Sequence, residues 1–123
     1  MTLTNAKMEA MIEDLKILLP HRDKIGYAAA RNTRILNDAL TEYSKFKNDL
    51  IRKYGKDDTD EEGNALPTVS LKYSDPNFKE FTKELEKISI IEHSVTLMTL
   101  KYEEIIGFLS GEEILRVSWM LED

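Results

Sequence analysis

The chain has 123 residues, a mass of 14.2 kDa, 41% hydrophobic residues and 33% charged residues, which suits one soluble domain spanning residues 1–123. It contains no cysteine, so disulfides, thiolate metal sites and cysteine nucleophiles are excluded. A net charge of −6 and a pI near 5.0 argue against a surface that binds polyanions everywhere. No uncharged run approaches the roughly 20 residues of a membrane span, so we expect no membrane partner and a cytoplasmic location.

Apolar residues at helical spacing predict a first amphipathic helix over residues 4–19. Thr4 is the expected N-cap, because its hydroxyl can accept from the free amides of the first turn. Pro20 is expected to end the helix, because it has no amide proton and disfavours helical geometry in the residue before it.

Residues 24–54 predict a second, much longer helix, about 45 Å long at a rise of about 1.5 Å per residue. Two interleaved heptad tracks run along it, as in a coiled coil. Gly55 supplies the stop. Asn32 falls on the apolar track and has two readings, a buried amide with satisfied hydrogen bonds or a residue rotated to the rim of the helix.

The second half of the chain alternates between strand and helix patterns. Residues 56–64 form an acidic connector that partly resembles a calcium loop, but Val69 stands where the loop needs a bidentate glutamate. Strands are predicted near 68–73 and 94–102, paired with each other, and helices near 76–88 and 111–121, the last opened by a Ser110/Glu113 capping box. The expected fold class is therefore α+β and predominantly helical, with a long central helix, a helical hairpin partner, a small two-stranded antiparallel element and a C-terminal helix.

No group of residues identifies a reaction. His21 and His93 are the only histidines and lie about seventy positions apart, and no phosphate loop or HExxH or GxSxG motif is present. We therefore expect no enzyme, no catalytic residues, no cofactor and no metal.

The long helix carries a basic face. Residues 24–56 hold eight basic and three acidic side chains, a local charge of +5 in an acidic protein. The basic residues proposed for interaction are Arg31, Arg34, Lys45 and Arg52. Nucleic acid is a possible partner of this face, but Asp38, Glu42 and Asp49 dilute it, so nucleic acid is not the favoured partner.

The same helix has more apolar surface than the other segments can cover. The apolar residues proposed for interaction are Leu36, Tyr43, Phe46 and Leu50. An exposed stripe of this kind favours protein–protein interaction, and a second copy is the simplest partner. We therefore predict a homodimer, together with a further protein partner whose identity is open.

Several short motifs occur in a fixed order along the chain: Leu18-Leu19-Pro20, Lys24, Gly26 to Ala30, Arg31-Asn32, Tyr54-Gly55, Asp60 to Asn64, Phe81 to Leu85, and Ser110 to Leu121. In this order they resemble a family of small proteins from phages and prophages of Gram-positive bacteria, a domain of unknown function numbered sixteen-seventeen. The resemblance implies a non-enzymatic accessory or assembly protein in the bacterial host or associated with the virion. A nucleic-acid-binding or host-directed inhibitor protein is the alternative. No catalytic or binding residue is transferred by the resemblance.

Overall fold

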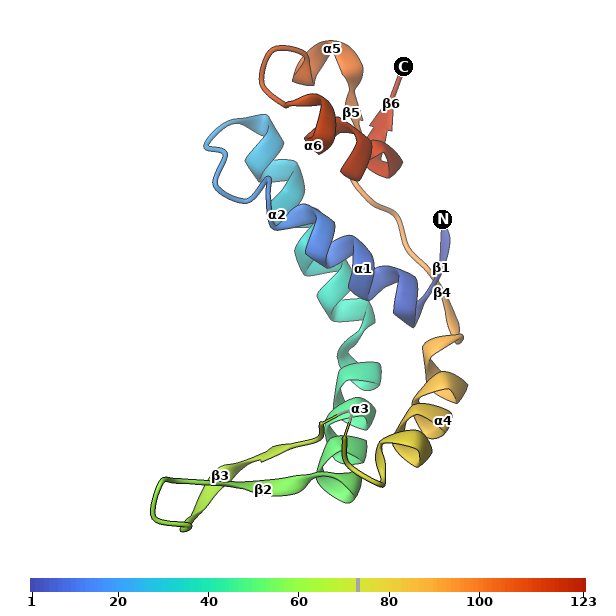
Figure 1. Ribbon diagram of the computed structural model, residues 1–123. Helices are drawn as coiled ribbons and strands as arrows, with labels where there is room; N and C mark the ends of the chain where they lie inside the picture. Colours follow the sequence, from blue (N-terminus) through green and yellow to red (C-terminus); the bar gives the residue numbers. More distant parts are fainter. Residues whose placement is uncertain (73) are drawn as a thin grey trace. The chain divides into compact units, whose positions relative to one another are not determined.

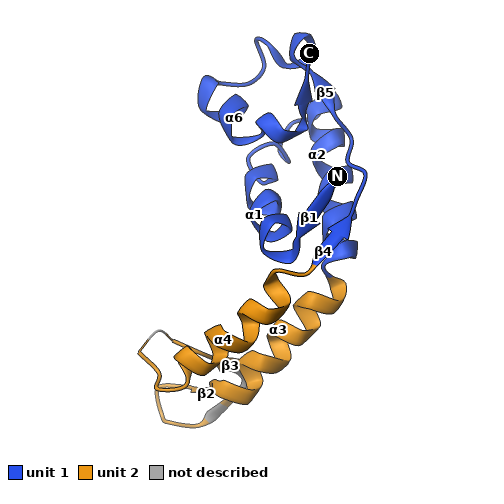
Figure 2. Ribbon diagram, turned by 90° about the vertical axis from the view of Figure 1, so that its right-hand side faces the viewer, with its two compact units in different colours: residues 1–40, 92–123 blue, residues 41–91 orange. Residues whose placement is uncertain are grey.

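The computed structural model describes residues 1–72 and 74–123, with the side chains of residues 57, 65, 67 and 68 left aside. The chain forms two compact units, unit 1 from residues 1–40 and 92–123 and unit 2 from residues 41–91 (Figure 2). This division does not test the prediction of a single domain, because compact units of one chain can also fold cooperatively.

The elements follow one another as shown in Figure 1. Unit 1 contains β1 (Thr2–Thr4), α1 (Asn5–Leu15), α2 (Lys24–Ala39), β4 (Glu92–Ser94), β5 (Leu100–Lys101), α5 (Tyr102–Ile105), α6 (Gly111–Arg116), a 3₁₀ turn (Ser118–Met120) and β6 (Leu121–Glu122). Unit 2 contains α3 (Thr41–Tyr54), β2 (Lys56–Thr59), β3 (Ala65–Ser70) and α4 (Phe78–Ser89). The predicted class, mostly helical α+β with a small two-stranded antiparallel sheet, is confirmed.

The core of unit 1 forms where α1 packs on α2. The fully buried side chains come from α1, the turn after it, α2 and the C-terminal segment: Met8, Met11, Leu15, Leu18, Ala28, Ala29, Leu36, Leu100, Ile105, Val117 and Met120. Gly26 is also buried, and a Cβ on it would lie 1.8 Å from the carbonyl oxygen of His21. A side chain at this position would therefore prevent the chain before α2 from lying against the helix.

The first helix is shorter than predicted. Thr4 caps it as expected, since its hydroxyl accepts from the amide of Lys7 at 3.1 Å. The helix ends at Leu15, and the chain then turns, with the amide of Leu18 donating to the carbonyl of Leu15 at 3.0 Å. The turn already begins before Pro20, so the proline follows the helix end without defining it.

Asn32 is completely buried and its amide group is satisfied. Its Nδ2 donates to the carbonyl of Met98 at 2.9 Å, and its Oδ1 accepts from the amide of Met98 at 2.7 Å. Of the two readings of this residue, the buried amide with satisfied hydrogen bonds is confirmed. The side chain holds the segment between β4 and β5 against α2 in the way that a neighbouring strand would.

The predicted strand over 94–102 is therefore wrong in its centre. Its ends are strands, β4 and β5, but residues 95–99 have no regular structure. Within them, the backbone groups of Met98 bond to the side chain of Asn32 in place of a strand. The predicted pairing is also wrong. β4 pairs antiparallel with β1, β2 pairs antiparallel with β3, and β5 pairs in parallel with β6.

The predicted single helix over 24–54 is two helices. Leu40 lies between α2 and α3 with φ −90° and ψ 0°, outside helical geometry, while its amide still donates to the carbonyl of Leu36 at 3.0 Å. The chain crosses from unit 1 to unit 2 at this residue, so the two heptad tracks do not form one continuous seam.

Unit 2 is a helix pair with a β-hairpin. α3 packs on α4, where Phe81 is buried and Lys53 Nζ lies 3.6 Å from Glu84 Oε1. The β2–β3 hairpin extends away from the two helices (Figures 1 and 2). At its base, a Cβ on Gly55 would lie 2.5 Å from the carbonyl oxygen of Ile51 in α3 and 2.7 Å from that of Ser70 in β3. A larger residue would therefore not fit between the end of α3 and β3.

The remaining predicted elements agree in part with the structure. The strand predicted at 68–73 overlaps β3, with residue 73 outside the described residues, and the helix predicted at 76–88 is α4. The helix predicted at 111–121 ends at Arg116 and continues as the 3₁₀ turn and β6. Its capping box is confirmed, because the amide of Glu113 donates to Ser110 Oγ at 3.2 Å and the amide of Ser110 donates to Glu113 Oε1 at 3.0 Å.

Candidate interaction surfaces

The exposed face of α2 forms the first candidate surface. Tyr27, Ala30, Arg31, Arg34 and Ile35 follow one another at helical spacing on the side opposite the buried residues, and they line a groove of about 540 Å³. We call these five residues the α2 groove. The aromatic ring of Tyr27 is 61% exposed although the rest of α2 supplies much of the core of unit 1.

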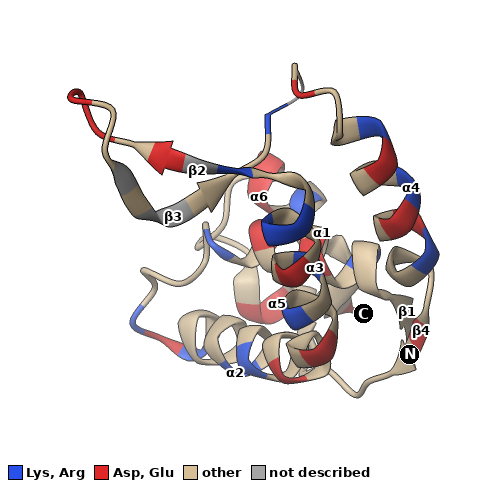
Figure 3. Cartoon of the chain, turned by 90° about the horizontal axis from the view of Figure 1, so that it is seen from below, with Lys and Arg blue, Asp and Glu red and all other residues tan. Residues whose placement is uncertain are grey.

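The charges of the α2 groove are not neutralised within the part of the chain that the structure describes. No carboxylate there forms an ion pair with Arg31 or Arg34, and the expected four-residue pair of Arg34 with Asp38 is not formed. Figure 3 shows basic residues along α2 and acidic residues on α5 and α6. Two guanidinium groups beside an exposed aromatic ring and an isoleucine provide both charged and apolar contacts for an acidic ligand.

The structure brings together two of the four predicted basic residues. Arg31 and Arg34 both line the α2 groove. Lys45 and Arg52 are exposed on α3, in unit 2, and line neither this groove nor the pocket described below. The sequence pattern missed Tyr27 and Ile35, because apolar residues in a helix are normally assigned to its buried face.

The predicted apolar stripe is wrong for two of its four residues. Leu36 and Tyr43 are buried within the chain, Leu50 is half-buried, and Phe46 alone of the four is largely exposed, at 57%. Leu36 is covered because α1 packs on α2. An interaction role for Phe46 and Leu50 stays a prediction.

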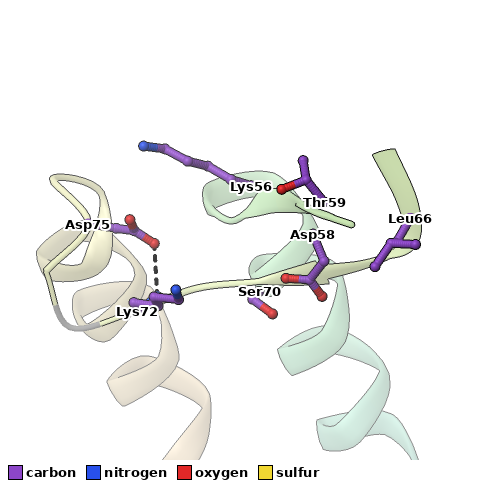
Figure 4. Close-up of a pocket in the computed structure, with 7 residues that line it drawn as sticks. All are labelled: Lys56, Asp58, Thr59, Leu66, Ser70, Lys72 and Asp75. Carbon is purple, nitrogen blue, oxygen red and sulfur yellow. Dashed lines mark hydrogen bonds between the residues drawn. The ribbon is translucent and has the colours of Figure 1, made fainter. Parts of the chain in front are cut away.

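A second candidate surface lies beside the β2–β3 hairpin. It is a polar pocket of about 470 Å³, which Figure 4 shows with the residues that line it, Lys56, Asp58, Thr59, Leu66, Ser70, Lys72 and Asp75. Asp75 Oδ2 accepts from the amide of Lys72 at 2.8 Å, so this carboxylate closes the turn before α4. The sequence does not predict this pocket, because the composition of residues 56–64 indicates a connector without strands.

The turn of the hairpin explains the acidic sequence that resembles a calcium loop. Asp60 Oδ1 accepts from the amides of Glu62 and Asn64, both at 2.9 Å, and the hydrogen bond from Asn64 is the main cause that lowers the pKa of Asp60. Gly63 has a φ of +85°, which a glycine adopts without strain. The carboxylate of Asp60 therefore stabilises the hairpin turn by accepting from the backbone amides of residues that follow it.

Histidines and carboxylates that could serve as catalytic or metal-binding groups are the last candidates. His21 Nδ1 lies 3.9 Å from Asp23 Oδ2, and His93 lies in β4. Across residues 1–72 and 74–123, no group of three or more histidines and carboxylates is arranged to hold a metal ion. None of the helices in these same ranges is long and apolar enough to cross a membrane.

Comparison with protein families, with curated proteins and with solved structures gives no match to this chain.

Proposed function

We propose that this protein is a non-enzymatic interaction protein that binds another protein through the α2 groove. The observation that carries the proposal is the exposure of Tyr27 beside Arg31 and Arg34, whose charges have no partner among the described residues. Tyrosine and arginine are the residue types that most often dominate binding energy at protein interfaces. A helix that presents them along one face is a common form of docking surface.

The biological setting of the proposal comes from the sequence motifs. Their order resembles a family of small phage and prophage proteins, which favours an accessory or assembly role in the cytoplasm of the bacterial host or on the virion. In such a role the α2 groove would bind an acidic and partly apolar surface of an assembly partner.

Nucleic acid is the second candidate ligand, because Arg31 and Arg34 are both free to contact phosphate groups. The apolar half of the groove favours protein, since Ile35 has no role on a phosphate backbone. A host-directed inhibitor would use the same face against a host protein, so it differs from an assembly factor in its partner and not in its chemistry.

A photo-crosslinking amino acid in place of Tyr27 tests the proposal in cells that produce the protein. We expect protein adducts from this position and few from a matched probe at Ala10, which is exposed on α1 in the same unit. Arg31→Ala together with Arg34→Ala should reduce the adducts. Adducts to nucleic acid, or purified protein that binds duplex DNA with an affinity falling steeply as salt rises, would favour the second candidate.

A further inference from the structure

The turn between α5 and α6 exposes large apolar side chains. Ile106 and Phe108 are 66% and 62% exposed, and they flank Gly107, whose φ is +90°. Leaving such side chains in water forgoes the favourable free energy of burying them. Leu115, on α6, is still more exposed.

The backbone holds this turn in place. Ile105 and Leu109, at its two ends, are buried, and the amides of Phe108 and Leu109 donate to the carbonyl of Ile105 at 3.0 and 3.2 Å. The positive φ of Gly107 directs the chain outward between the two buried anchors. The apolar side chains are therefore presented by a turn that is already ordered, which lowers the entropy cost of binding.

Carboxylates flank the exposed residues on both sides. Glu103 lies in α5 and Glu112 in α6, both exposed, and within the described residues neither forms an ion pair. We call Ile106, Phe108, Glu103 and Glu112 together the α5–α6 tip. It combines two apolar side chains with two unneutralised negative charges.

The α2 groove has the complementary composition. It combines the apolar surfaces of Tyr27 and Ile35 with the two positive charges of Arg31 and Arg34. The same pairing of charges already occurs inside unit 1, where Lys24 of α2 forms an ion pair with Glu104 of α5.

We propose that the α5–α6 tip of one copy docks into the α2 groove of a second copy. The proposal rests on the proposed function of the α2 groove and names its partner. The acidic flanks of the tip oppose binding to an anionic membrane surface and favour a basic protein surface. Because tip and groove are different surfaces, two copies either exchange both contacts in a closed two-fold dimer or make a single heterologous contact, which continues beyond a dimer unless a ring closes.

Charge reversal tests the proposal in sedimentation experiments on the purified full chain. We expect the unmodified protein to associate as its concentration rises, and more weakly at high salt. A tip variant with E103K and E112K, and a groove variant with R31E and R34E, should each associate roughly tenfold to a hundredfold more weakly. A control with K45E and R52E reverses two exposed charges on α3 and should associate like the unmodified protein.

Mixing the two variants makes the test specific. The basic tip of the tip variant then meets the acidic groove of the groove variant, so the mixture should regain association that neither variant has alone. Recovery also shows that both variants are folded. Should either variant fail to fold, Phe108→Ser and Tyr27→Ser replace them, and each should abolish association without a change in charge.

Three results would overturn the proposal: an unmodified protein that stays monomeric at several hundred micromolar, association that survives both reversals, or a mixture that stays monomeric. A monomeric protein whose Tyr27 probe still captures another protein in cells would refute self-docking and leave the proposed function standing. A monomeric protein whose probe captures nothing would refute both.

Discussion

Replacing Asn32 by alanine should destabilise unit 1 by about 2 kcal/mol. The side chain is completely buried and makes two hydrogen bonds to the backbone of Met98, one as donor and one as acceptor. Alanine removes both bonds and leaves an amide and a carbonyl of Met98 without their partner.

The magnitude follows from three terms. A hydrogen bond contributes about 1 kcal/mol net, so the two bonds account for about 2 kcal/mol. Leaving a buried polar group without a partner costs about 1–3 kcal/mol, and because Met98 is only half-buried we take about 1 kcal/mol for its two groups together. The better helix propensity of alanine returns up to about 0.7 kcal/mol.

Trp119 makes the measurement simple. It is the only tryptophan in the chain and lies in unit 1, where its Nε1 donates to Asp14 Oδ2 at 3.4 Å. Urea unfolding followed by its fluorescence therefore reports on the unit that contains Asn32. Asp38→Ala is the control, because Asp38 is exposed in the same helix and gains a similar helix propensity.

The same measurement can refute the role given to Asn32. If Asn32→Ala were within about 0.5 kcal/mol of Asp38→Ala, the two bonds to Met98 would not hold the segment, since that difference is typical of surface substitutions. Asn32→Asp gives a second measurement. It keeps the acceptor for the Met98 amide but places a carboxylate against the Met98 carbonyl, so its stability should improve as the pH falls and the carboxylate is protonated.

Three further predictions concern the caps and the hairpin. Gly55→Ala places a Cβ 2.7 Å from the carbonyl of Ser70 and should cost about 1–3 kcal/mol, seen as faster amide exchange in the hairpin, whereas Gly111→Ala, with nothing within 4 Å, should not. Ser110→Ala removes the α6 cap and should cost about 1 kcal/mol in the fluorescence assay, and a neutral result would exclude a contribution of the cap. The hydrogen bond from the Ser110 amide lowers the pKa of Glu113 below its ordinary value of 4.5, so its stabilising effect is present above that pH and is lost as the pH falls through the folded pKa. Glu113→Gln should flatten that part of the pH profile, and an unchanged profile would assign it to other groups.

Local features of the fold could be predicted because they depend on residues close in sequence. Thr4 and Ser110 both cap the helices they were expected to cap, since a hydroxyl needs only the amide three residues later. Gly55 follows the last residue of α3 as expected, but without the positive φ of a glycine cap, and its small size is needed for its contacts with Ile51 and Ser70. The break at Leu40 could not be predicted, because no glycine or proline marks it and the change in backbone geometry is confined to one residue.

Strand pairing failed because it depends on partners far apart in the chain. β1 is only three residues long and no strand is predicted there, yet it is the partner of β4, with Leu3 opposite His93. Residues 95–99 have the composition of a strand, but the backbone groups of Met98 bond to the side chain of Asn32, and those of Val95 bond to Met1. A pattern of alternating residues shows that a segment is extended and does not show what it pairs with.

Only some of the exposed side chains in the candidate surfaces could be predicted from the sequence. Arg31 and Arg34 could be chosen from the sequence, because charged residues on a polar helix face are almost always exposed. The exposure of apolar residues could not be predicted in the same way. Leu36 is buried where an exposed stripe was expected, and Ile106 and Phe108 are exposed where no exposed apolar surface was expected. Burial of Leu36 removes part of the surface on which the predicted homodimer depended. A different exposed apolar surface lies on the α5–α6 tip, where Gly107 has a positive φ between the buried residues Ile105 and Leu109.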